Sequence, residues 1–250
     1  MQDKSLKVNI GGNYYKNMFK LMPYLEELTI FGGEPFSCNS TKKIIFGEEI
    51  KKYPQIHFST ISNATLLNDE MQNKLERLQL GVFSFSIDSC VEKTYEEIRK
   101  NGIFAVTMKN IEDFVRRRDE GKIRIKEIEI NCVIQQTNYR EISKFVEYAH
   151  SLNIKSGFSF ITGFSELHNK INEIKDCLND AITTADTLGE KETSKQLSFL
   201  LRELPENSKK TKRLYIINDM IKIPQKEKII LFIRRHGKIR NIIKKILNIK

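Results

Sequence analysis

The sequence predicts an α/β fold in which a parallel sheet is covered by helices. Short runs rich in β-branched and aromatic residues alternate with amphipathic helical segments, and polar residues follow the ends of several of these runs. Alternating strands and helices form right-handed β-α-β units, in a sheet that is either open or curved toward a barrel. The chain has 250 residues, of which 40% are hydrophobic, enough for one domain with a sizeable core or one domain plus an appendage.

Five segments are predicted to be strands because they are short, apolar and bounded by turn-forming residues. The predicted strands are residues 28–31, 56–61, 82–87, 126–134 and 157–161. Apolar residues at helical spacing fill most of the intervals between them. The predicted helices are residues 13–25, 68–79, 104–119 and 139–152, and Asn68 or Asp69 is the expected cap of the second one.

The predicted fold lacks a clear first strand. A parallel sheet would place another strand before the helix at 13–25, and the short, partly polar segment 6–10 is the available candidate. We therefore expect the first strand of the sheet to be missing.

Beyond Phe164 the pattern changes from strands to helices. One long helix is expected at 166–188 and a second at 193–204, and a turn-rich stretch at 204–208 precedes a basic region. The expected organisation is a barrel-like core at 1–164, a helical extension at 165–208 and a basic amphipathic tail at 209–250.

Positive charge is concentrated in the carboxyl-terminal part of the sequence. Residues 201–250 hold 15 of the 42 basic residues and 4 of the 32 acidic ones, so the remainder is nearly neutral. The net charge of +10 is therefore poor support for nucleic-acid binding by the whole protein. Residues 228–250 read as a basic amphipathic helix, which either contacts an anionic membrane or an acidic partner, or packs its apolar stripe on the core.

Compartment and metal content are constrained by what the sequence lacks. No stretch approaches the roughly 20 apolar residues that span a bilayer, and Met1–Ser5 shows no secretory signal, which predicts a cytoplasmic protein. Four cysteines lie far apart and read as reduced thiols rather than as a disulfide framework or a metal site. They are Cys38, Cys90, Cys132 and Cys177.

The strand at 28–31 runs directly into Gly32, Gly33, Glu34 and Pro35. The glycines let the backbone approach a ligand closely, and the acid then faces a polar group. The carboxyl end of a buried parallel strand is where α/β barrels place their active sites. The alternative reading of the same residues is a turn that ends a strand.

Three further segments have the same polar character. Residues 60–67 end the second strand with hydroxyls and an amide, and in 84–88 the polar residues Ser84, Ser86 and Asp88 are expected to share one face. Residues 94–102 include Arg99, which is suited to bind a carboxylate through two hydrogen bonds. The alternatives without a ligand are that Arg99 is a solvated helix residue and that Ser86 and Asp88 cap the following helix.

In combination these motifs resemble the radical S-adenosylmethionine (SAM) superfamily, in particular its peptide-modifying, SPASM-type branch. The resemblance covers about residues 20–160. It rests on the GGEP at 32–35, the SNxTLL pattern at 62–67, the SID at 86–88 and the YEEIR at 95–99. It implies a partial (β/α)6 barrel that is open on one side for its substrate.

The resemblance also implies how SAM would be bound. Gly32, Gly33 and Glu34 would hold the amino group of the methionine moiety, because an ammonium has donors only. Asn63 would line the same cavity. The family's chemistry is reductive SAM cleavage by a [4Fe–4S] cluster, followed by hydrogen-atom abstraction from a peptide or a small polar substrate.

The remaining implied SAM contacts come from the third strand and the helix after it. Ser86 and Asp88 would lie near the ribose, and Arg99 would pair with the methionine carboxylate. Two residues depart from the family's glycines, Ala64 and Ser89.

The largest departure is the absence of the CxxxCxxC motif that holds the family's cluster, and the SPASM cysteines are also absent from this sequence.

Three hypotheses follow. In the first, the chain is a radical SAM core that lacks its cluster ligands and has no assignable catalytic residue of its own, and a separate cluster-bearing segment would complete it. Alternatively it is a non-catalytic relative that binds SAM or a partner. The third is an unrelated α/β binding protein whose tail contacts a membrane or nucleic acid.

Overall fold

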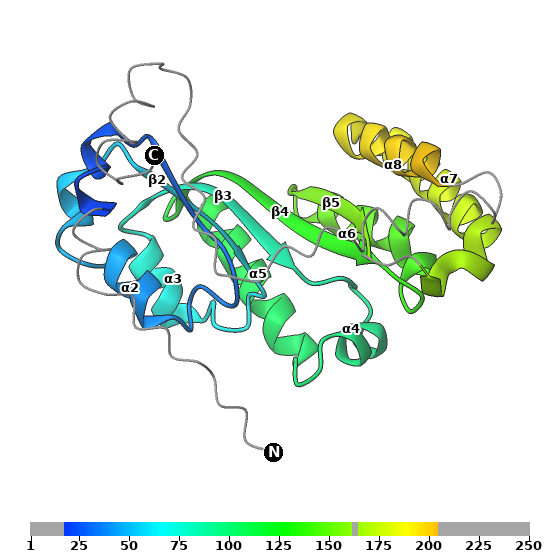
Figure 1. Ribbon diagram of the computed structural model, residues 1–250, viewed down its shortest axis with the longest axis horizontal. Helices are drawn as coiled ribbons and strands as arrows, with labels where there is room; N and C mark the ends of the chain where they lie inside the picture. The colour runs from blue at the N-terminus through cyan, green and yellow to red at the C-terminus, as the bar shows by residue number, and fades with distance from the viewer. Residues whose placement is uncertain (1–17, 162–164, 205–250) are drawn as a thin grey trace, which may run out of the picture.

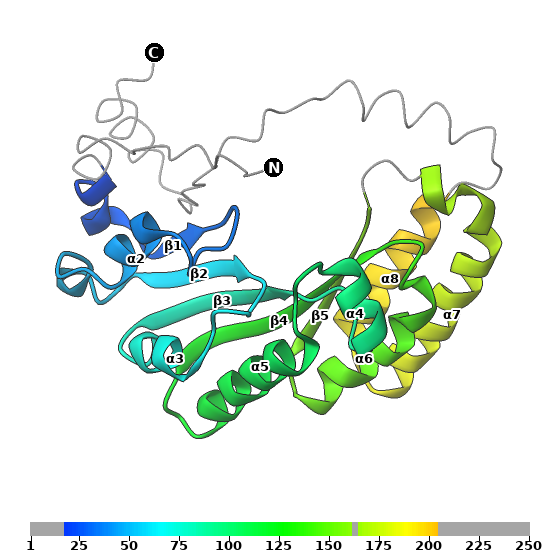
Figure 2. The same ribbon diagram turned by 90° about the horizontal axis from the view of Figure 1, so that it is seen from below.

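The computed structural model describes residues 18–161 and 165–204, which form a single five-stranded parallel sheet with helices packed against it (Figure 1). The strand order follows the chain. The strands are β1 (Glu27–Ile30), β2 (His57–Ser62), β3 (Gln79–Ser86), β4 (Arg124–Ile134) and β5 (Lys155–Phe160). When strands that follow one another in the chain are also neighbours in the sheet, right-handed crossovers place all of their connecting helices on the same face. Figure 2 accordingly shows α3, α5 and α6 together along one face.

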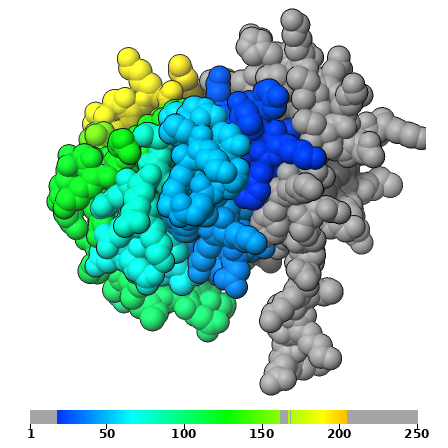
Figure 3. Space-filling view, turned by 90° about the vertical axis from the view of Figure 1, so that its left-hand side faces the viewer, coloured from blue at the N-terminus to red at the C-terminus, as the bar shows by residue number. Residues whose placement is uncertain are grey.

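Helices follow each strand. The α-helices are α2 (Asn39–Ile45), α3 (Asp69–Leu75), α4 (Glu92–Ile98), α5 (Phe104–Asp119), α6 (Ile142–Ser151), α7 (Ile171–Thr187) and α8 (Lys191–Glu203). The short 3₁₀ helices are η1 (Met22–Tyr24), η2 (Ile50–Lys52), η3 (Tyr139–Glu141) and η4 (Ser165–Lys170). Figure 3 shows the molecule from the side on which the segments from η1 to α3 lie, coloured blue to cyan. Within the described ranges, no helix is long and apolar enough to cross a membrane.

The core lies between the helices and one face of the sheet. Phe83 of β3 is fully buried and stacks on Phe114 of α5, with ring centroids 5.3 Å apart. Phe58 of β2 meets Phe83 edge-on at 5.6 Å. Each such ring contributes about 2–3 kcal/mol by leaving water.

Strand β4 shows why the second face of the sheet is polar. Its isoleucines at 128, 130 and 134 are buried, whereas Glu127, Glu129 and Asn131 alternate with them and are half-exposed. Successive side chains of a strand point to opposite faces. One face of the sheet therefore belongs to the core and the other presents polar groups.

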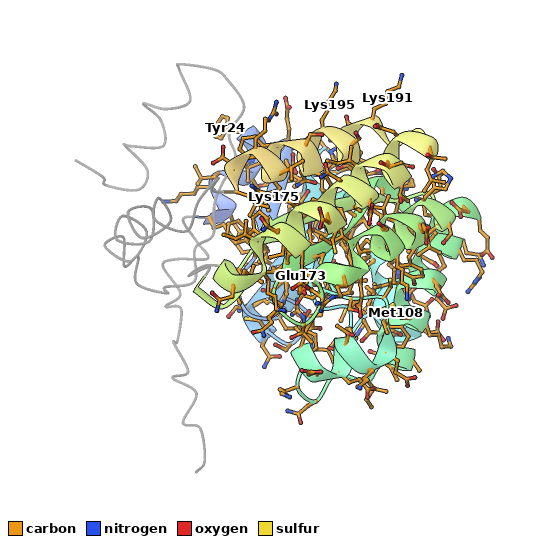
Figure 4. The ribbon with its side chains drawn as sticks, turned by 90° about the vertical axis from the view of Figure 1, so that its right-hand side faces the viewer. Tyr24, Met108, Glu173, Lys175, Lys191 and Lys195 are labelled. Carbon is orange, nitrogen blue, oxygen red and sulfur yellow. The ribbon has the colours of Figure 1, made fainter. Side chains whose placement is uncertain are left out.

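The helix α8 covers the outer edge of β5. Gln196 of α8 donates from Nε2 to the Phe158 carbonyl oxygen at 3.1 Å, and the hydroxyls of Ser156 and Thr193 lie 3.2 Å apart. α7 packs between α6 and α8. Lys191 and Lys195 project outward from α8 in Figure 4. A helix that binds edge carbonyls protects the edge from pairing with another chain.

The expected strands and most of the expected helices are confirmed. All five strands occur within three residues of their predicted ends, and α5 coincides with the predicted 104–119. The expected α/β fold and its helical extension are therefore present. The segment 6–10, which is the available candidate for the strand expected to be missing, lies outside the described residues, as does the tail at 209–250 with its membrane and partner alternatives.

Four predicted helices need correction. The predicted helix 139–152 is the 3₁₀ helix η3 followed by α6. The helix that Asn68 caps ends at Leu75 rather than at 79, because Gln79 already pairs with His57 in the sheet. The predicted long helix 166–188 is the 3₁₀ helix η4 followed by α7. Of the predicted helix 13–25, the structure describes residues 18–25, which include the 3₁₀ helix η1 with a proline in its first turn. The proposed division at 164 and 208 stays a prediction.

Candidate functional site

Three loops meet at the carboxyl ends of β1, β2 and β3. In the register of the sheet, Ile30 is opposite Thr60, and Ser62 is opposite Phe85. Because the strands are parallel neighbours, the loops that follow them leave the sheet at the same edge. This places the segments 32–35, 62–67 and 86–91 side by side.

Glu34 joins the first loop to the second. Its Oε1 accepts hydrogen bonds from the Phe36 N–H at 3.1 Å and the Ser62 hydroxyl at 2.9 Å, and its Oε2 accepts from the Asn63 N–H at 2.9 Å. A carboxylate has about four acceptor positions, so one more donor is still accommodated. Glu34 is half-buried, so its carboxylate remains accessible to a ligand.

Gly32 and Gly33 give the first loop its shape. Their φ angles are 110° and 57°, and a Cβ at either position would meet nothing within 4 Å. Glycine is therefore required by backbone conformation and not by lack of space. A small cavity of about 150 Å³ lies beside the loop, lined by Gly32, Gly33, Glu34, Cys38 and Thr41 among others.

Asn63 is used mainly within the second loop. Its Oδ1 accepts from the N–H and the hydroxyl of Thr65, at 3.0 and 2.6 Å. Ala64 follows with φ of 60° and is fully buried. Its carbonyl oxygen accepts from Nδ2 of Asn110 on α5 at 2.9 Å. Where the family has glycine, residue 64 is thus an alanine in left-handed backbone, and its surroundings keep it in that conformation.

Asp88 and Arg99 form an ion pair. Arg99 Nη2 lies 2.6 Å from Asp88 Oδ2, and Asp88 Oδ1 accepts from the Val133 N–H at 2.9 Å. Asp88 is 5% exposed and has φ of 63°, whereas the Arg99 side chain is 30% exposed. The Nε of Arg99 is buried, and among the described residues it has no hydrogen-bond partner.

Ser86 is half-buried at the last position of β3, opposite Asn131 in the register with β4. Ser84, two residues earlier, is buried and accepts a hydrogen bond from Asn131 Nδ2. The expected shared face of 84, 86 and 88 ends at Ser86, because the left-handed turn at Asp88 directs its carboxylate to β4 and α4.

A second polar cluster fastens the third loop. Glu141 of η3 accepts from the Ser89 hydroxyl at 2.5 Å and from the Thr94 hydroxyl at 2.6 Å. Burial, with the nearby Glu141 carboxylate, raises the pKa of the Cys90 thiol to about 11. This thiol is protonated near neutral pH and is therefore a poor nucleophile.

Sequence reasoning missed two buried asparagines that hold these loops, Asn110 and Asn138. Asn138 donates from Nδ2 to the Asp88 carbonyl oxygen at 2.8 Å, as Asn110 does to that of Ala64. A signal existed for Asn110, because it is a polar residue next to Ile111 on the apolar face of a predicted helix. Asn138 lies in a turn, where asparagine is common and gives no such signal.

The residues present do not fit an iron–sulfur cluster. Three of the four cysteines follow or lie in β1, β3 and β4, and the fourth is in α7, at positions 38, 90, 132 and 177. Over the ranges that the structure describes, no three histidine, cysteine or acidic side chains are grouped to hold a metal ion. Cluster binding needs closely placed thiolates.

A wider cavity of about 660 Å³ lies where β4 and β5 meet α8. Its walls include Glu127, Glu129, Asn131, Lys155 and Gln196. Lys155 is bound to Glu127 at 2.6 Å and to Glu192 at 2.8 Å. This cavity is polar and lies beyond β3, apart from the loop around Glu34.

Comparison with solved structures finds a similar fold in anSMEcpe. Native anSMEcpe with bound AdoMet and the Kp18Cys peptide aligns with a TM-score of 0.50 at 17% identity, over 67% of this chain and 49% of that one. SuiB from Streptococcus suis bound to S-adenosylmethionine aligns at 0.49 and 15%, over 68% and 39%. SuiB bound to its precursor peptide SuiA aligns at 0.47 and 16%, over 68% and 40%.

The chain therefore spans less than half the length of these neighbours. Comparisons with protein-family models and with curated sequences gave no match. The likeness establishes the fold alone: the described chain is an open, five-stranded parallel α/β sheet of the kind that anSMEcpe contains.

Proposed function

We propose that the chain binds S-adenosyl-L-methionine at the carboxyl ends of β1, β2 and β3. One observation carries the proposal: the half-buried carboxylate of Glu34 lies on the loop after β1, and the partly exposed guanidinium of Arg99 is bound by Asp88 on the loop after β3, at the same edge of the sheet. The methionine moiety of SAM carries an ammonium and a carboxylate, which complement these two charges. SAM is also present in the anSMEcpe structure that shares the fold.

The ammonium is assigned to the first loop. Glu34 has an acceptor position left after its three protein donors, and the glycine carbonyls add acceptors of the kind that an ammonium requires. The loop has left-handed backbone at Gly32 and Gly33, a conformation that glycine adopts without the steric cost that other residues incur.

The carboxylate is assigned to Arg99. One nitrogen of its guanidinium binds Asp88, and its buried Nε has no partner among the described residues. A buried donor without an acceptor is costly, and a ligand carboxylate would satisfy it. Arginine binds carboxylates through two parallel hydrogen bonds, which fixes the ligand's orientation.

For the ribose we propose Ser86, with Asn63 lining the cavity. Asp88 was assigned to the ribose on the resemblance alone, and its two oxygens already bind Val133 and Arg99. We propose that its principal part is to orient Arg99. The ribose assignment of Asp88 stays a prediction.

We infer that this SAM site belongs to the core of a radical SAM enzyme that acts on a peptide. The fold is that of peptide-modifying enzymes, and anSMEcpe is bound to a peptide. When bound, a [4Fe–4S] cluster supplies the electron for SAM cleavage, but the cysteines of this chain do not fit that group. A separate cluster-bearing segment would have to supply it. The dispersed cysteines equally favour a second candidate, a non-catalytic protein that binds SAM.

Calorimetric titration with SAM tests the binding proposal. We expect binding by the wild type, and a loss of about tenfold or more in affinity for Glu34→Gln and for Arg99→Ala, because each removes a charge-assisted contact. The control is Arg116→Ala, an exposed arginine whose partners are Asp113 of its own helix and Glu120, which caps that helix. Unchanged affinity in both site variants would refute the residue assignment, and a wild type that does not bind SAM would refute the function.

A further inference from the structure

Asn138 is a buried polar side chain whose hydrogen bonds converge on the Arg99 site. It is 1% exposed and lies in the turn after β4. Its Nδ2 donates to the carbonyl oxygens of Asp88 at 2.8 Å and Val133 at 3.0 Å, and its Oδ1 accepts from the Gln135 N–H at 2.8 Å. The amide group thus ties the third loop to the end of β4.

The residue that Asn138 holds is in a conformation that needs support. Asp88 has φ of 63°, which is left-handed backbone that non-glycine residues adopt only when their surroundings enforce it. Its N–H donates to the Asn131 carbonyl oxygen at 3.1 Å, and its carboxylate accepts from the Val133 N–H. Together with the bond from Asn138, these contacts fix the whole Asp88 residue against β4.

The fixed position of Asp88 in turn orients the guanidinium of Arg99. With its backbone and Oδ1 fixed, Asp88 directs Oδ2 at Arg99, 2.6 Å from Nη2. Arg99 caps the carboxyl end of α4 and is partly exposed, so its side chain would otherwise have freedom to turn into solvent.

We propose that Asn138 is a positioning residue for Arg99: through Asp88, it holds the guanidinium where the carboxylate of the methionine moiety binds. This inference rests on the proposed function. It adds a role for a residue that touches neither SAM nor Arg99.

The same chain offers a matched control. Asn110 donates to the carbonyl oxygen of Ala64 at 2.9 Å, and Ala64 has φ of 60°. Both asparagines are buried and both hold a left-handed residue after a strand. Ala64 has no charged side chain to direct, so Asn110 should stabilise its loop without any dependence on Arg99.

The first test needs no ligand. Free energies of unfolding by urea are measured for Asn138→Ala, Arg99→Ala and the double variant, and likewise for Asn110→Ala with Arg99→Ala. If Asn138 acts through the Asp88–Arg99 pair, the double variant loses less than the sum of the single variants. The Asn110 pair should be additive. Additivity at Asn138 would overturn the proposal, and Asn138→Ser replaces the alanine variant if the latter does not fold.

The second test uses ligands that differ in the group Arg99 binds. SAM and 5′-methylthioadenosine, which lacks the amino-acid portion, are titrated into the full chain and its Asn138 variant. We expect affinity for SAM to fall about tenfold while that for 5′-methylthioadenosine is unchanged, since the lost contact concerns the carboxylate. Equal losses for both ligands would show a general structural defect and overturn the proposal. A wild type that binds neither ligand would refute the proposed function, and the unfolding cycle would still decide the role of Asn138.

Discussion

Left-handed backbone shapes each loop of the candidate site. Gly32 and Gly33 adopt it without steric cost, whereas Ala64 and Asp88 need hydrogen bonds from buried asparagines to keep it. Sequence reasoning identified Glu34 and Arg99 as charged residues of one site. It did not find the protein partners of Glu34 and Asp88, because Ser62 is 28 residues from Glu34 and Val133 is 45 from Asp88, and only folding brings them together.

Gly33→Ala tests the conformational requirement at the first loop. An added Cβ has no neighbour within 4 Å, so strain alone should lower the free energy of unfolding, by about 1–2 kcal/mol. Gly189→Ala is the matched control, since its φ is 78° and its Cβ site is also open. Urea unfolding should show similar losses in both. SAM affinity should fall in the first alone, and an equal fall in both would contradict the role of the loop.

At the scale of elements, the boundaries of helices were predicted where local signals decide them. Asn68 caps α3 because its Oδ1 accepts from the Met71 N–H at 3.0 Å, a contact within the first turn. The end of α3 was missed because it is set by the pairing of Gln79 with His57, a contact between segments. The 3₁₀ start before α7 was missed for a similar reason, since amphipathic periodicity does not distinguish the two helix types over six residues.

Asn68→Ala tests the cap of α3. Loss of the side-chain acceptor leaves the Met71 N–H without its partner and should cost about 1 kcal/mol of unfolding free energy. Urea or thermal unfolding measures it. Asn68→Asp keeps an acceptor at the same place and should retain wild-type stability. Equal destabilisation by both substitutions would show that the cap bond is unimportant.

Glu173 fastens the start of α7 to η3. It accepts from Lys170 at 2.8 Å and from the Tyr139 hydroxyl at 2.6 Å, and it pairs with Arg140. The hydrogen bond from Lys170, followed by that from Tyr139, lowers the pKa of Glu173 from 4.5 to about 2. Glu173 is labelled in Figure 4, which views this side of the molecule.

A lowered pKa in the folded state means that the Glu173 carboxylate stabilises the protein above its unfolded pKa, and that this contribution is lost as pH falls from about 4.5 toward about 2. Glu173→Gln should therefore be less stable than wild type at pH 7 and equal to it near pH 2. Melting temperatures across that range, compared between the two proteins, cancel the effect of other carboxylates. A difference that does not shrink with acid would contradict this account.

At the scale of the whole molecule, five sequential parallel strands with helices on one face make an open partial barrel whose second face is polar. The helix α8 covers the β5 edge, and α7 packs against α6 and α8. This arrangement gathers the candidate site at the carboxyl ends of β1–β3 and a polar cavity against α8.

Anaerobic reconstitution with iron and sulfide tests what the chain does by itself. Because its cysteines are dispersed, we expect no stoichiometric [4Fe–4S] absorption and no cleavage of SAM, even where SAM binds. Iron content, the visible spectrum and product analysis measure this. A stoichiometric cluster that cleaves SAM would show that these residues suffice for the reaction.

The sequence by itself determined the order of strands and helices, the polar loop after each of the first three strands, and the lack of a cluster motif. Each is a local property, read from periodicity, turn residues or spacing. Only the tertiary structure decided that Asp88 binds Arg99, that Glu34 binds the second loop, and that two buried asparagines hold these loops in place. Such contacts join residues far apart in the chain, and a buried polar group takes whichever partner folding brings within hydrogen-bond distance.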